Sequence, residues 1–175
     1  MTQKTIYKIC SEDDIPQILK IYRQSYVEHY TYLWTDNGEN YMNMSFTKEK
    51  IFSEMNDNNT RFFLIYSEKL PVGVLKINDS KSFNGAINND SLEIERLYFL
   101  KEAAGKGLGK STLEMVLELA ASEKKKNIWL KAMKTADAVK FYQKQDFLTI
   151  GEADLSYPFL KDEFKRMVIM KRDVK

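Results

Sequence analysis

The sequence is poor in the features that mark secreted, membrane-spanning or disulfide-stabilised proteins. Cys10 is the only cysteine, so no internal disulfide can form. The first residues contain no apolar run of signal-peptide length. No later stretch approaches the roughly 20 apolar residues that a membrane-spanning helix needs. These absences lead us to expect a cytoplasmic protein that has no membrane partner.

A marked excess of one charge is missing too, as are internal repeats, low-complexity tracts and linkers. The 27 Lys and Arg residues nearly balance the 25 Asp and Glu residues, which leaves a net charge of +2. A dedicated nucleic-acid-binding surface usually carries a clear basic excess, so we expect no nucleic-acid partner. We also expect no metal. At 43% hydrophobic and 30% charged residues, residues 1–175 are predicted to form a single globular domain.

The hydrophobic pattern predicts strands and helices that alternate along the chain. The segment 91–100, SLEIERLYFL, changes the phase of its apolar residues between Ile94 and Leu97, which predicts a β-bulge. We expect a helix end and a long loop over 28–46, and a polar loop over 80–90. Strands are predicted at 4–10, 60–69, 70–79, 91–100, 127–133 and 166–172, and helices at 11–26, 47–55, 108–120 and 136–145.

The stretch AAGKGLGKS follows the predicted bulged strand and fits two kinds of phosphate-binding loop. From Ala104 it is one residue away from the nucleotide P-loop G-x-x-x-x-G-K-[ST]. However, no strand after it ends in the aspartate that would hold magnesium, which argues against an NTPase. A dinucleotide fingerprint would need glycine where Lys110 stands.

The second interpretation is a glycine turn that opens a helix onto a pyrophosphate. Backbone N–H groups at a helix N-terminus bind anions, and glycines let the anion approach the main chain closely. Lys106 and Lys110 add positive charge around this site. The alternative is that the glycines only make a tight turn and the lysines are solvated.

Two segments together resemble a known family. IERLYFLKEAAGKGLGKSTLEMVLELA followed by IWLKAMKTADAVKFYQKQDF, within Glu93 to Phe147, is similar to the acetyl-CoA-binding core of the GNAT N-acetyltransferases. That core carries an R/Q-x-x-G-x-G/A loop after a bulged strand, and later a helix reading N-x-x-A-x-x-F-Y-x-x-x-G-F. The aromatic segment with His29 and Trp34, PVGVLKIN and LYFLKE are most similar to the PaiA-type branch, whose substrates include polyamines.

The resemblance implies an α/β fold with a mixed, mostly antiparallel sheet that is split at the bulge and flanked by helices. It also implies direct transfer of an acetyl group from acetyl-CoA to a primary amine, either a small amine or a polyamine. The helix tyrosine of the motif, Tyr142, would protonate the departing CoA thiolate; without the motif, a core tyrosine that shares a face with Phe141 would be the favoured interpretation. The cofactor-binding residues implied are Leu97, Tyr98, Phe99, Gly105, Lys106, Gly107, Leu108, Gly109, Lys110 and Thr135.

The chain departs from the family pattern at three positions. Ala104 replaces the usual Arg or Gln, but the loop binds mostly through backbone amides. Thr135 stands where Asn is common and keeps a hydroxyl for the cofactor arm. Asp146 replaces the glycine before Phe147, and Asp tolerates the left-handed backbone conformation better than most residues.

The base and the acceptor contacts are less defined by the sequence. Glu95, on the strand that enters the bulge, is the best candidate for the general base, directly or through water. Glu93, two residues earlier, would point to the same face of the strand as Glu95. Both carboxylates could instead lie on a solvated face. His29 could be a base or a substrate contact, or a structural or surface histidine at a helix end. Trp34 is a candidate substrate contact: with nearby tyrosines it would form an aromatic lid over a cation or simply pack the loop. Acidic side chains that would suit a polycation are Glu28, Asp36 and Glu39.

Two further functions remain open at this point. The domain could bind acyl-CoA without catalysis, as a sensor or regulatory module. It could also acetylate a protein N-terminus or lysine instead of a small molecule. Because GNAT proteins are often dimers, the resemblance also suggests a homodimer.

Overall fold

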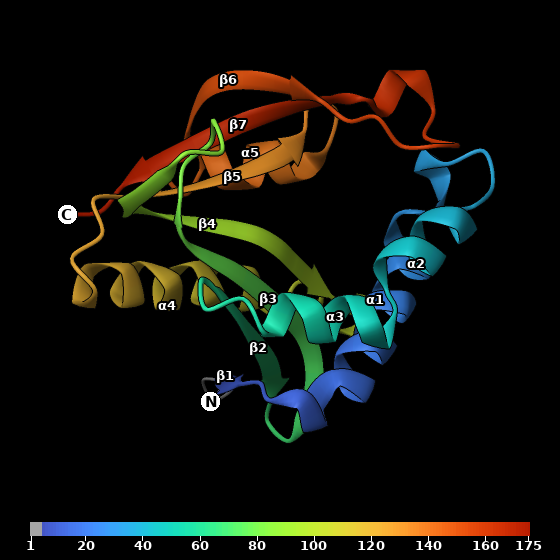
Figure 1. Ribbon diagram of the computed structural model, residues 1–175, viewed down its shortest axis with the longest axis horizontal. Coiled ribbons are helices and arrows are strands. Elements are labelled where there is room, and N and C mark those ends of the chain that lie inside the picture. The colour runs from blue at the N-terminus through green and yellow to red at the C-terminus, as the bar shows by residue number, and fades with distance from the viewer. Residues whose placement is uncertain (1–4) are drawn as a thin grey trace.

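The chain builds one seven-stranded sheet in the computed structural model, which describes residues 5–175 (Figure 1). The strand order is β1-β2-β3-β4-β5-β7-β6. The strands are β1 (Thr5–Ile9), β2 (Thr60–Ser67), β3 (Leu70–Lys81), β4 (Ile87–Phe99), β5 (Asn127–Met133), β6 (Leu148–Asp154) and β7 (Arg166–Asp173). The α-helices are α1 (Ile15–His29), α2 (Glu39–Ser45), α3 (Lys48–Met55), α4 (Leu108–Ser122) and α5 (Asp137–Gln143), and 3-10 turns lie at Glu12–Asp14, Thr31–Leu33, Lys101–Ala103 and Asp162–Phe164.

The sheet is antiparallel at every pairing except that of β4 with β5, which is parallel. Within residues 5–175, this parallel pairing covers Ser91–Ile94 and Asn127–Leu130 and then ends. Figure 1 shows the two arrows separating toward their C-terminal ends. The sheet is therefore mixed, mostly antiparallel and split, as the sequence predicted.

The split begins at a β-bulge in β4. Lys76 of β3 lies opposite Arg96, but the next residue, Ile77, lies opposite Ile94, so Glu95 is the extra residue of β4. A bulge bends its strand and increases the local twist, which turns the rest of β4 away from β5. The phase change read from the sequence is thus a real irregularity, and it places Glu95 where the two strands part.

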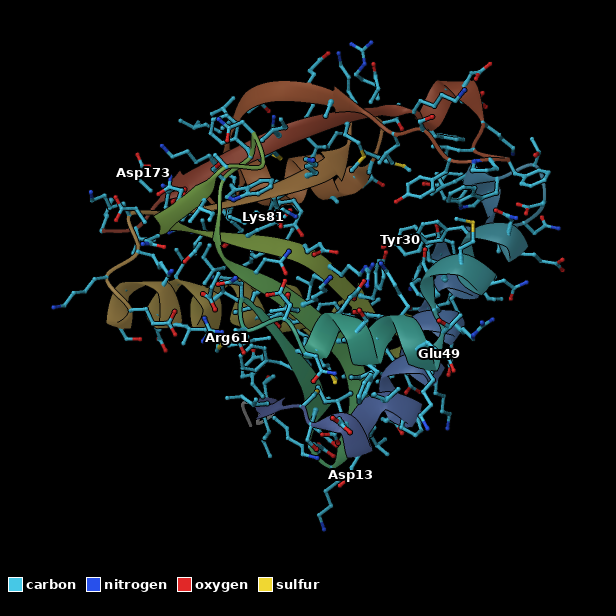
Figure 2. All side chains as sticks on the ribbon, viewed as in Figure 1. Asp13, Tyr30, Glu49, Arg61, Lys81 and Asp173 are labelled. Carbon is cyan, nitrogen blue, oxygen red and sulfur yellow. The ribbon has the colours of Figure 1, made fainter. Side chains whose placement is uncertain are left out.

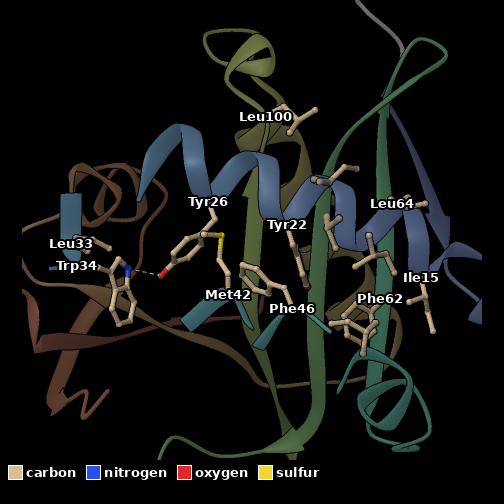
Figure 3. Close-up of a cluster of buried hydrophobic side chains, with 14 of the residues drawn as sticks. Ile15, Tyr22, Tyr26, Leu33, Trp34, Met42, Phe46, Phe62, Leu64 and Leu100 are labelled. Carbon is tan, nitrogen blue, oxygen red and sulfur yellow. Dashed lines mark hydrogen bonds between the residues drawn. The ribbon is translucent and has the colours of Figure 1, made fainter. Parts of the chain in front are cut away.

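Alternating side chains of the strands feed two separate cores. In β2, Phe62 and Leu64 face α1 and α3, whereas Phe63 and Ile65 face α4. The core under α1 is rich in aromatic side chains, and Figure 3 shows Tyr22, Tyr26 and Phe46 packed side by side within it. Burial of apolar surface on both faces holds the sheet between the helices, at roughly 25 cal/mol per Å².

The structure corrects three expectations. The edge strand β6 was not predicted: its side chains are mostly exposed, and the alternation of Leu148 and Ile150 with Thr149 stops at Gly151. The polar loop over 80–90 is shorter, since β3 runs to Lys81 and β4 begins at Ile87. The long loop over 28–46 contains α2 and a 3-10 turn. The predicted first strand began at Lys4, which lies outside the described residues.

None of the helices in residues 5–175 is both long enough and apolar enough to span a bilayer.

Candidate active site

The split exposes backbone groups of β4 toward β5. The N–H of Leu100 donates to the Val72 carbonyl at 2.9 Å, so this residue faces β3. Because successive residues of a strand point their backbone groups in opposite directions, Leu97 and Phe99 face the gap, and Tyr98 faces β3. The gap therefore presents strand-like donors and acceptors that an extended ligand can pair with, as an added strand would.

The glycine loop lies at the end of β4, between two buried anchors. Ala103 and Leu108 are buried, while residues 104–107 are exposed. Gly105 and Gly107 both have a φ of +73°, and a Cβ built on either would meet no atom within 4 Å. The loop is thus an open cradle in the left-handed backbone conformation that favours glycine.

The cradle leads into the N-terminus of α4. Gly107 is the N-cap, and no side chain caps this helix end. The first-turn amides of Leu108, Gly109 and Lys110 are consequently available to an anion, and the helix dipole favours negative charge there. Lys110 and Lys106 are exposed beside them. The loop is therefore a turn that opens a helix with uncapped amides, which is the arrangement that the pyrophosphate interpretation requires.

Replacing Gly107 with Ala is expected to weaken the binding of acetyl-CoA about tenfold, which corresponds to about 1.4 kcal/mol. The new methyl group would point into the open cradle, and the backbone strain would cost about 1 kcal/mol of folding stability. Gly85→Ala is a matched control, since Gly85 also has a positive φ (+83°) and open space around it but lies in the β3–β4 loop. Calorimetric titration with acetyl-CoA should show an affinity loss for Gly107→Ala alone; equal losses in both variants would contradict the assignment.

Tyr142 projects from α5 on the far side of the split. Its ring packs against Phe141 and Phe147, with centroid distances of 5.2 and 5.6 Å. Burial raises the pKa of Tyr142 well above that of a free tyrosine, and the nearby phenol of Tyr30 raises the pKa further. Tyr30 lies at the end of α1, on the side that faces the sheet (Figure 2). The phenol thus stays protonated at neutral pH and can act as a hydrogen-bond donor. The family motif is also in register here: Asp146 takes the left-handed conformation with a φ of +62°.

The bulge brings two carboxylates to one amide. Asn78 of β3 donates through Nδ2 to Glu93 Oε2 at 2.7 Å and also to Glu95. The hydroxyl of Thr60 donates to Asn78 Oδ1 at 2.9 Å, which fixes the orientation of that amide. Glu93 is buried and also pairs with Lys81 at 3.0 Å. Neither carboxylate therefore belongs to a freely solvated face.

Glu95 is held in its charged form by its surroundings. Burial alone would raise the pKa of Glu95, but the charges of Lys76 and Arg96 and the hydrogen bonds from Lys76 and Asn78 outweigh it and lower the pKa. Lys76 Nζ lies 2.8 Å from the Glu95 carboxylate. Glu95 is consequently ionised at neutral pH and able to accept a proton, most readily one relayed through water.

The lowered pKa of Glu95 makes the stability of the fold depend on pH. A carboxyl group whose folded pKa is depressed stabilises the fold above its unfolded pKa, about 4.3, and the contribution is lost as the pH falls through the folded value. The free energies of unfolding of the wild type and of Glu95→Gln, measured in urea, should therefore differ most above about pH 5. The two curves should converge in more acidic solution, and a pH-independent difference would argue against this ion pair.

A buried ion-pair cluster lies behind Glu95. Arg96 donates to both carboxylate oxygens of Glu54 on α3, at 2.9 and 3.3 Å, and Lys76 Nζ lies 3.0 Å from the same carboxylate. The Arg96 guanidinium also lies over the Tyr22 ring at 5.7 Å. This cluster joins α3 to β3 and β4, so the backbone of the bulge is fixed from the side opposite α4.

A cavity of about 490 Å³ opens over this cluster. It lies between α3, the ends of β2 and β3, and the β3–β4 loop, and its wall includes Glu95 at the bulge. Its charged lining residues are Lys50, Glu54, Asp57, Lys76, Asp79, Lys81 and Glu95. The cavity thus lies beside α3, and the bulged Glu95 is the point at which its wall meets the start of the split.

Other residues singled out in the sequence have structural roles or lie at the periphery. Trp34 is only 4% exposed, and its indole N–H donates to the Tyr26 hydroxyl at 2.9 Å, so it packs in the core and forms no lid (Figure 3). His29 is half-buried at the end of α1, with its ring 6.0 Å from that of Tyr30. Thr135 is exposed in the turn between β5 and α5.

Two of the acidic residues suggested for a polycation are already engaged. Glu28 accepts a hydrogen bond from the Lys101 backbone N–H at 2.7 Å, and thereby ties α1 to the turn before the glycine loop. Asp36 accepts from the N–H groups of Gly38 and Asn40, at 2.9 Å each. These carboxylates organise backbone turns.

Sequence reasoning missed the partners of Glu95, namely Lys76, Asn78 and Arg96, and it missed Glu54, which shares Lys76 and Arg96 with Glu95. A signal for two of them was present in LPVGVLKIND, where Lys76 and Asn78 alternate with apolar residues in the buried middle of the strand, residues 72–78. Polar side chains at such positions need partners, and the partners had to come from neighbouring strands and α3.

Comparisons with known proteins agree with this geometry. Residues 26–156 match the family described as acetyltransferase (GNAT) domain. An uncharacterised N-acetyltransferase from the region 3′ of pepI in Lactobacillus delbrueckii subsp. lactis is 24% identical over 147 residues, which cover 81% of this chain and 83% of that protein.

Solved structures share the fold at lower identity. PaiA N-acetyltransferase from Thermoplasma acidophilum, crystallised in complex with coenzyme A, superposes with a TM-score of 0.76 at 16% identity, over 97% of this chain and 99% of that one. A variant of the spermidine N-acetyltransferase SpeG from Vibrio cholerae gives a TM-score of 0.69 at 16% identity, over 97% and 93% of the two chains. The chain belongs to the GNAT acetyltransferase family: it is an N-acetyltransferase, and acetyl-CoA is its cosubstrate.

Proposed function

We propose that the protein acetylates a small primary amine by direct transfer in a ternary complex. The pantetheine arm would lie along β4 in the split, paired with the backbone of Leu97 and Phe99, and the pyrophosphate would occupy the cradle of Gly105 to Lys110. Tyr98 would contribute backbone to the same strand segment. The observation that carries this proposal is the parting of β4 from β5 beyond Ile94 and Leu130, directly at the bulged Glu95.

The acceptor would enter from the cavity beside α3, which Glu95 lines. An alkylammonium has a reference pKa near 10.4 and must lose a proton before it attacks. Glu95 would take that proton, through water, because its carboxylate is ionised and lines the cavity. The nitrogen then forms a bond to the thioester carbon, and the N–H of Phe99 stabilises the oxyanion.

The nitrogen of the tetrahedral adduct releases its second proton to water, and collapse of the adduct then breaks the C–S bond and gives the amide and the CoA thiolate. Tyr142 would donate a hydrogen bond, and then a proton, to that sulfur. Because the pKa of Tyr142 is raised, and a free thiol has a pKa near 8.5, its main contribution would be a hydrogen bond to the developing thiolate. Cys10 lies after the edge strand β1 and has no part in this scheme.

The test is CoA-thiol release from acetyl-CoA with a panel of acceptors: simple monoamines, diamines, spermidine, spermine, amino acids and a lysine peptide. Release with one or more of the small amines would support the proposal, and the polyamines would report on the resemblance to the PaiA-type branch. Release only with the peptide would move the assignment to protein acetylation. Binding of acetyl-CoA without release by any acceptor would contradict the proposed class of acceptor.

A further inference from the structure

The side-chain amide of Asn78 joins the two carboxylates at the bulge. Its Nδ2 donates to Glu93 Oε2 at 2.7 Å and also to Glu95 Oε2, and its Oδ1 accepts from the Thr60 hydroxyl at 2.9 Å. Asn78 itself is only 6% exposed. Because both N–H groups and the carbonyl of this amide have partners, its orientation is fixed.

The two carboxylates need a donor between them. Oxygens that share one nitrogen lie within the roughly 4–6 Å over which one negative charge disfavours another. Without the donor, the pair would relieve this repulsion by taking up a proton, and a protonated Glu95 is no base. Lys81 pairs with Glu93 at 3.0 Å. Lys76, however, is shared between Glu95 and Glu54, so its charge does not compensate Glu95 alone.

The other groups around Glu95 do not take the place of this amide. Arg96 lies 3.6 Å from Glu95 Oε1, which is beyond hydrogen-bond distance, and its closer contact is with Glu54. Of the residues that the structure describes, Asn78 alone donates to both Glu93 and Glu95. The charged or titratable groups that surround Glu95 are Lys76, Asp79 and Lys81 of β3, Glu93 and Arg96 of β4, Lys50 and Glu54 of α3, Asp57 after α3, and Tyr22 of α1.

We infer that Asn78 is a positioning residue for the acetyl transfer: it keeps Glu93 and Glu95 ionised side by side and fixes the carboxylate that acts as the base. This inference rests on the proposed function, in which Glu95 takes the proton of the amine. Asn78 donates to Oε2 of Glu95, whereas Oε1 accepts from Lys76 at 2.8 Å. Since a carboxylate oxygen has two acceptor sites, Oε1 keeps one for the water that carries the proton.

Carbon-13 NMR of protein labelled at the glutamate carboxyl groups measures the titration of Glu95 directly, with Glu95→Gln to assign its signal. Asn78→Ala should move the midpoint of Glu95 upward by about one pH unit or more, because a hydrogen bond to the charged form is lost and the charge of Glu93 remains. Adding Glu93→Gln to Asn78→Ala should lower the midpoint again. An unchanged midpoint in Asn78→Ala, or a double variant that keeps the raised midpoint, would overturn the inference.

Thr60→Val is a second variant, which keeps Asn78 and disturbs the fold less. Loss of the hydroxyl that holds the amide should move the midpoint of Glu95 in the same direction but by less than Asn78→Ala does. Thr60→Ser retains a hydroxyl and should keep the wild-type midpoint. A midpoint that is the same in Thr60→Val and Thr60→Ser would contradict the fixed orientation of the amide.

Kinetics separates a positioning role from a structural one. With the fastest amine of the acceptor panel, Asn78→Ala should lower kcat/KM about tenfold at neutral pH and move its acidic limb upward, because the base is less well placed and more easily protonated. Ser91→Ala is the matched control, since Ser91 is a buried polar residue of β4 whose hydroxyl donates to Asn127 Oδ1 at 3.0 Å.

Equal losses in Asn78→Ala and Ser91→Ala, or an acidic limb that does not move, would make Asn78 structural only and leave the acetylation of small amines standing. A raised midpoint of Glu95 in Asn78→Ala, found for a protein that turns over no amine, would support the control of Glu95 by Asn78 and contradict the proposed reaction.

Discussion

Tyr142→Phe is expected to lower kcat by about two orders of magnitude or more, the usual range for loss of one hydrogen-bond donor to charge that develops in the transition state. Phenylalanine keeps the ring that packs against Phe141 and Phe147, so the fold and the core contacts should remain. The hydroxyl acts on the sulfur only as charge develops there. The KM for acetyl-CoA should consequently change little, while kcat and kcat/KM fall together.

Tyr7→Phe serves as the control for this substitution. Tyr7 is also a half-buried tyrosine whose ring packs against the α4-side core, but it lies in the edge strand β1, and its hydroxyl contacts Thr112 at 3.4 Å. Steady-state kinetics of both variants separate loss of a phenol near the sulfur from general loosening of this core. Similar kcat losses in the two variants, or an unchanged kcat in Tyr142→Phe, would remove Tyr142 from the reaction.

The sequence was most informative where local chemistry fixes local structure. The phase change in SLEIERLYFL located the bulge, and the bulge alone explains why β4 leaves β5 beyond Ile94. Gly105 and Gly107 of AAGKGLGKS form the predicted turn that opens a helix, because a positive φ and an uncapped helix start are properties of a few adjacent residues.

The features that sequence reasoning missed depend on contacts between distant segments. Glu54 gives no sign in TKEKIFSEM that it faces Arg96, which lies 42 positions away along the chain. Trp34 sits in a segment without a clear period, so core packing and a substrate lid were equally good interpretations until its hydrogen bond to Tyr26 was known. Strand β6 escaped because an exposed edge strand needs no apolar face.

Loss of Glu54 from the ion-pair cluster is expected to lower the free energy of unfolding substantially. Glu54→Ala would leave Arg96 and Lys76 without their shared carboxylate, although their side chains are only 12% and 5% exposed. Removing one partner from a buried ion pair typically costs about 3–5 kcal/mol, because the remaining charge is buried without compensation. Since Glu95 still contacts Lys76 at 2.8 Å, we expect a loss near the lower end, about 3 kcal/mol, in urea unfolding at neutral pH.

Glu49→Ala is the matched control, since Glu49 is exposed in the first turn of the same helix. This substitution should lower the free energy of unfolding by no more than about 1 kcal/mol. A cost of similar size in both variants would mean that the cluster contributes little to folding.

Glu54→Ala also has a consequence for the reaction. Without Glu54, the charges of Lys76 and Arg96 act on Glu95 alone and lower its pKa further, which makes it a weaker proton acceptor. Glu54→Ala should therefore reduce kcat even where the variant is still fully folded, so that one buried carboxylate links the stability of the bulge to the basicity of Glu95.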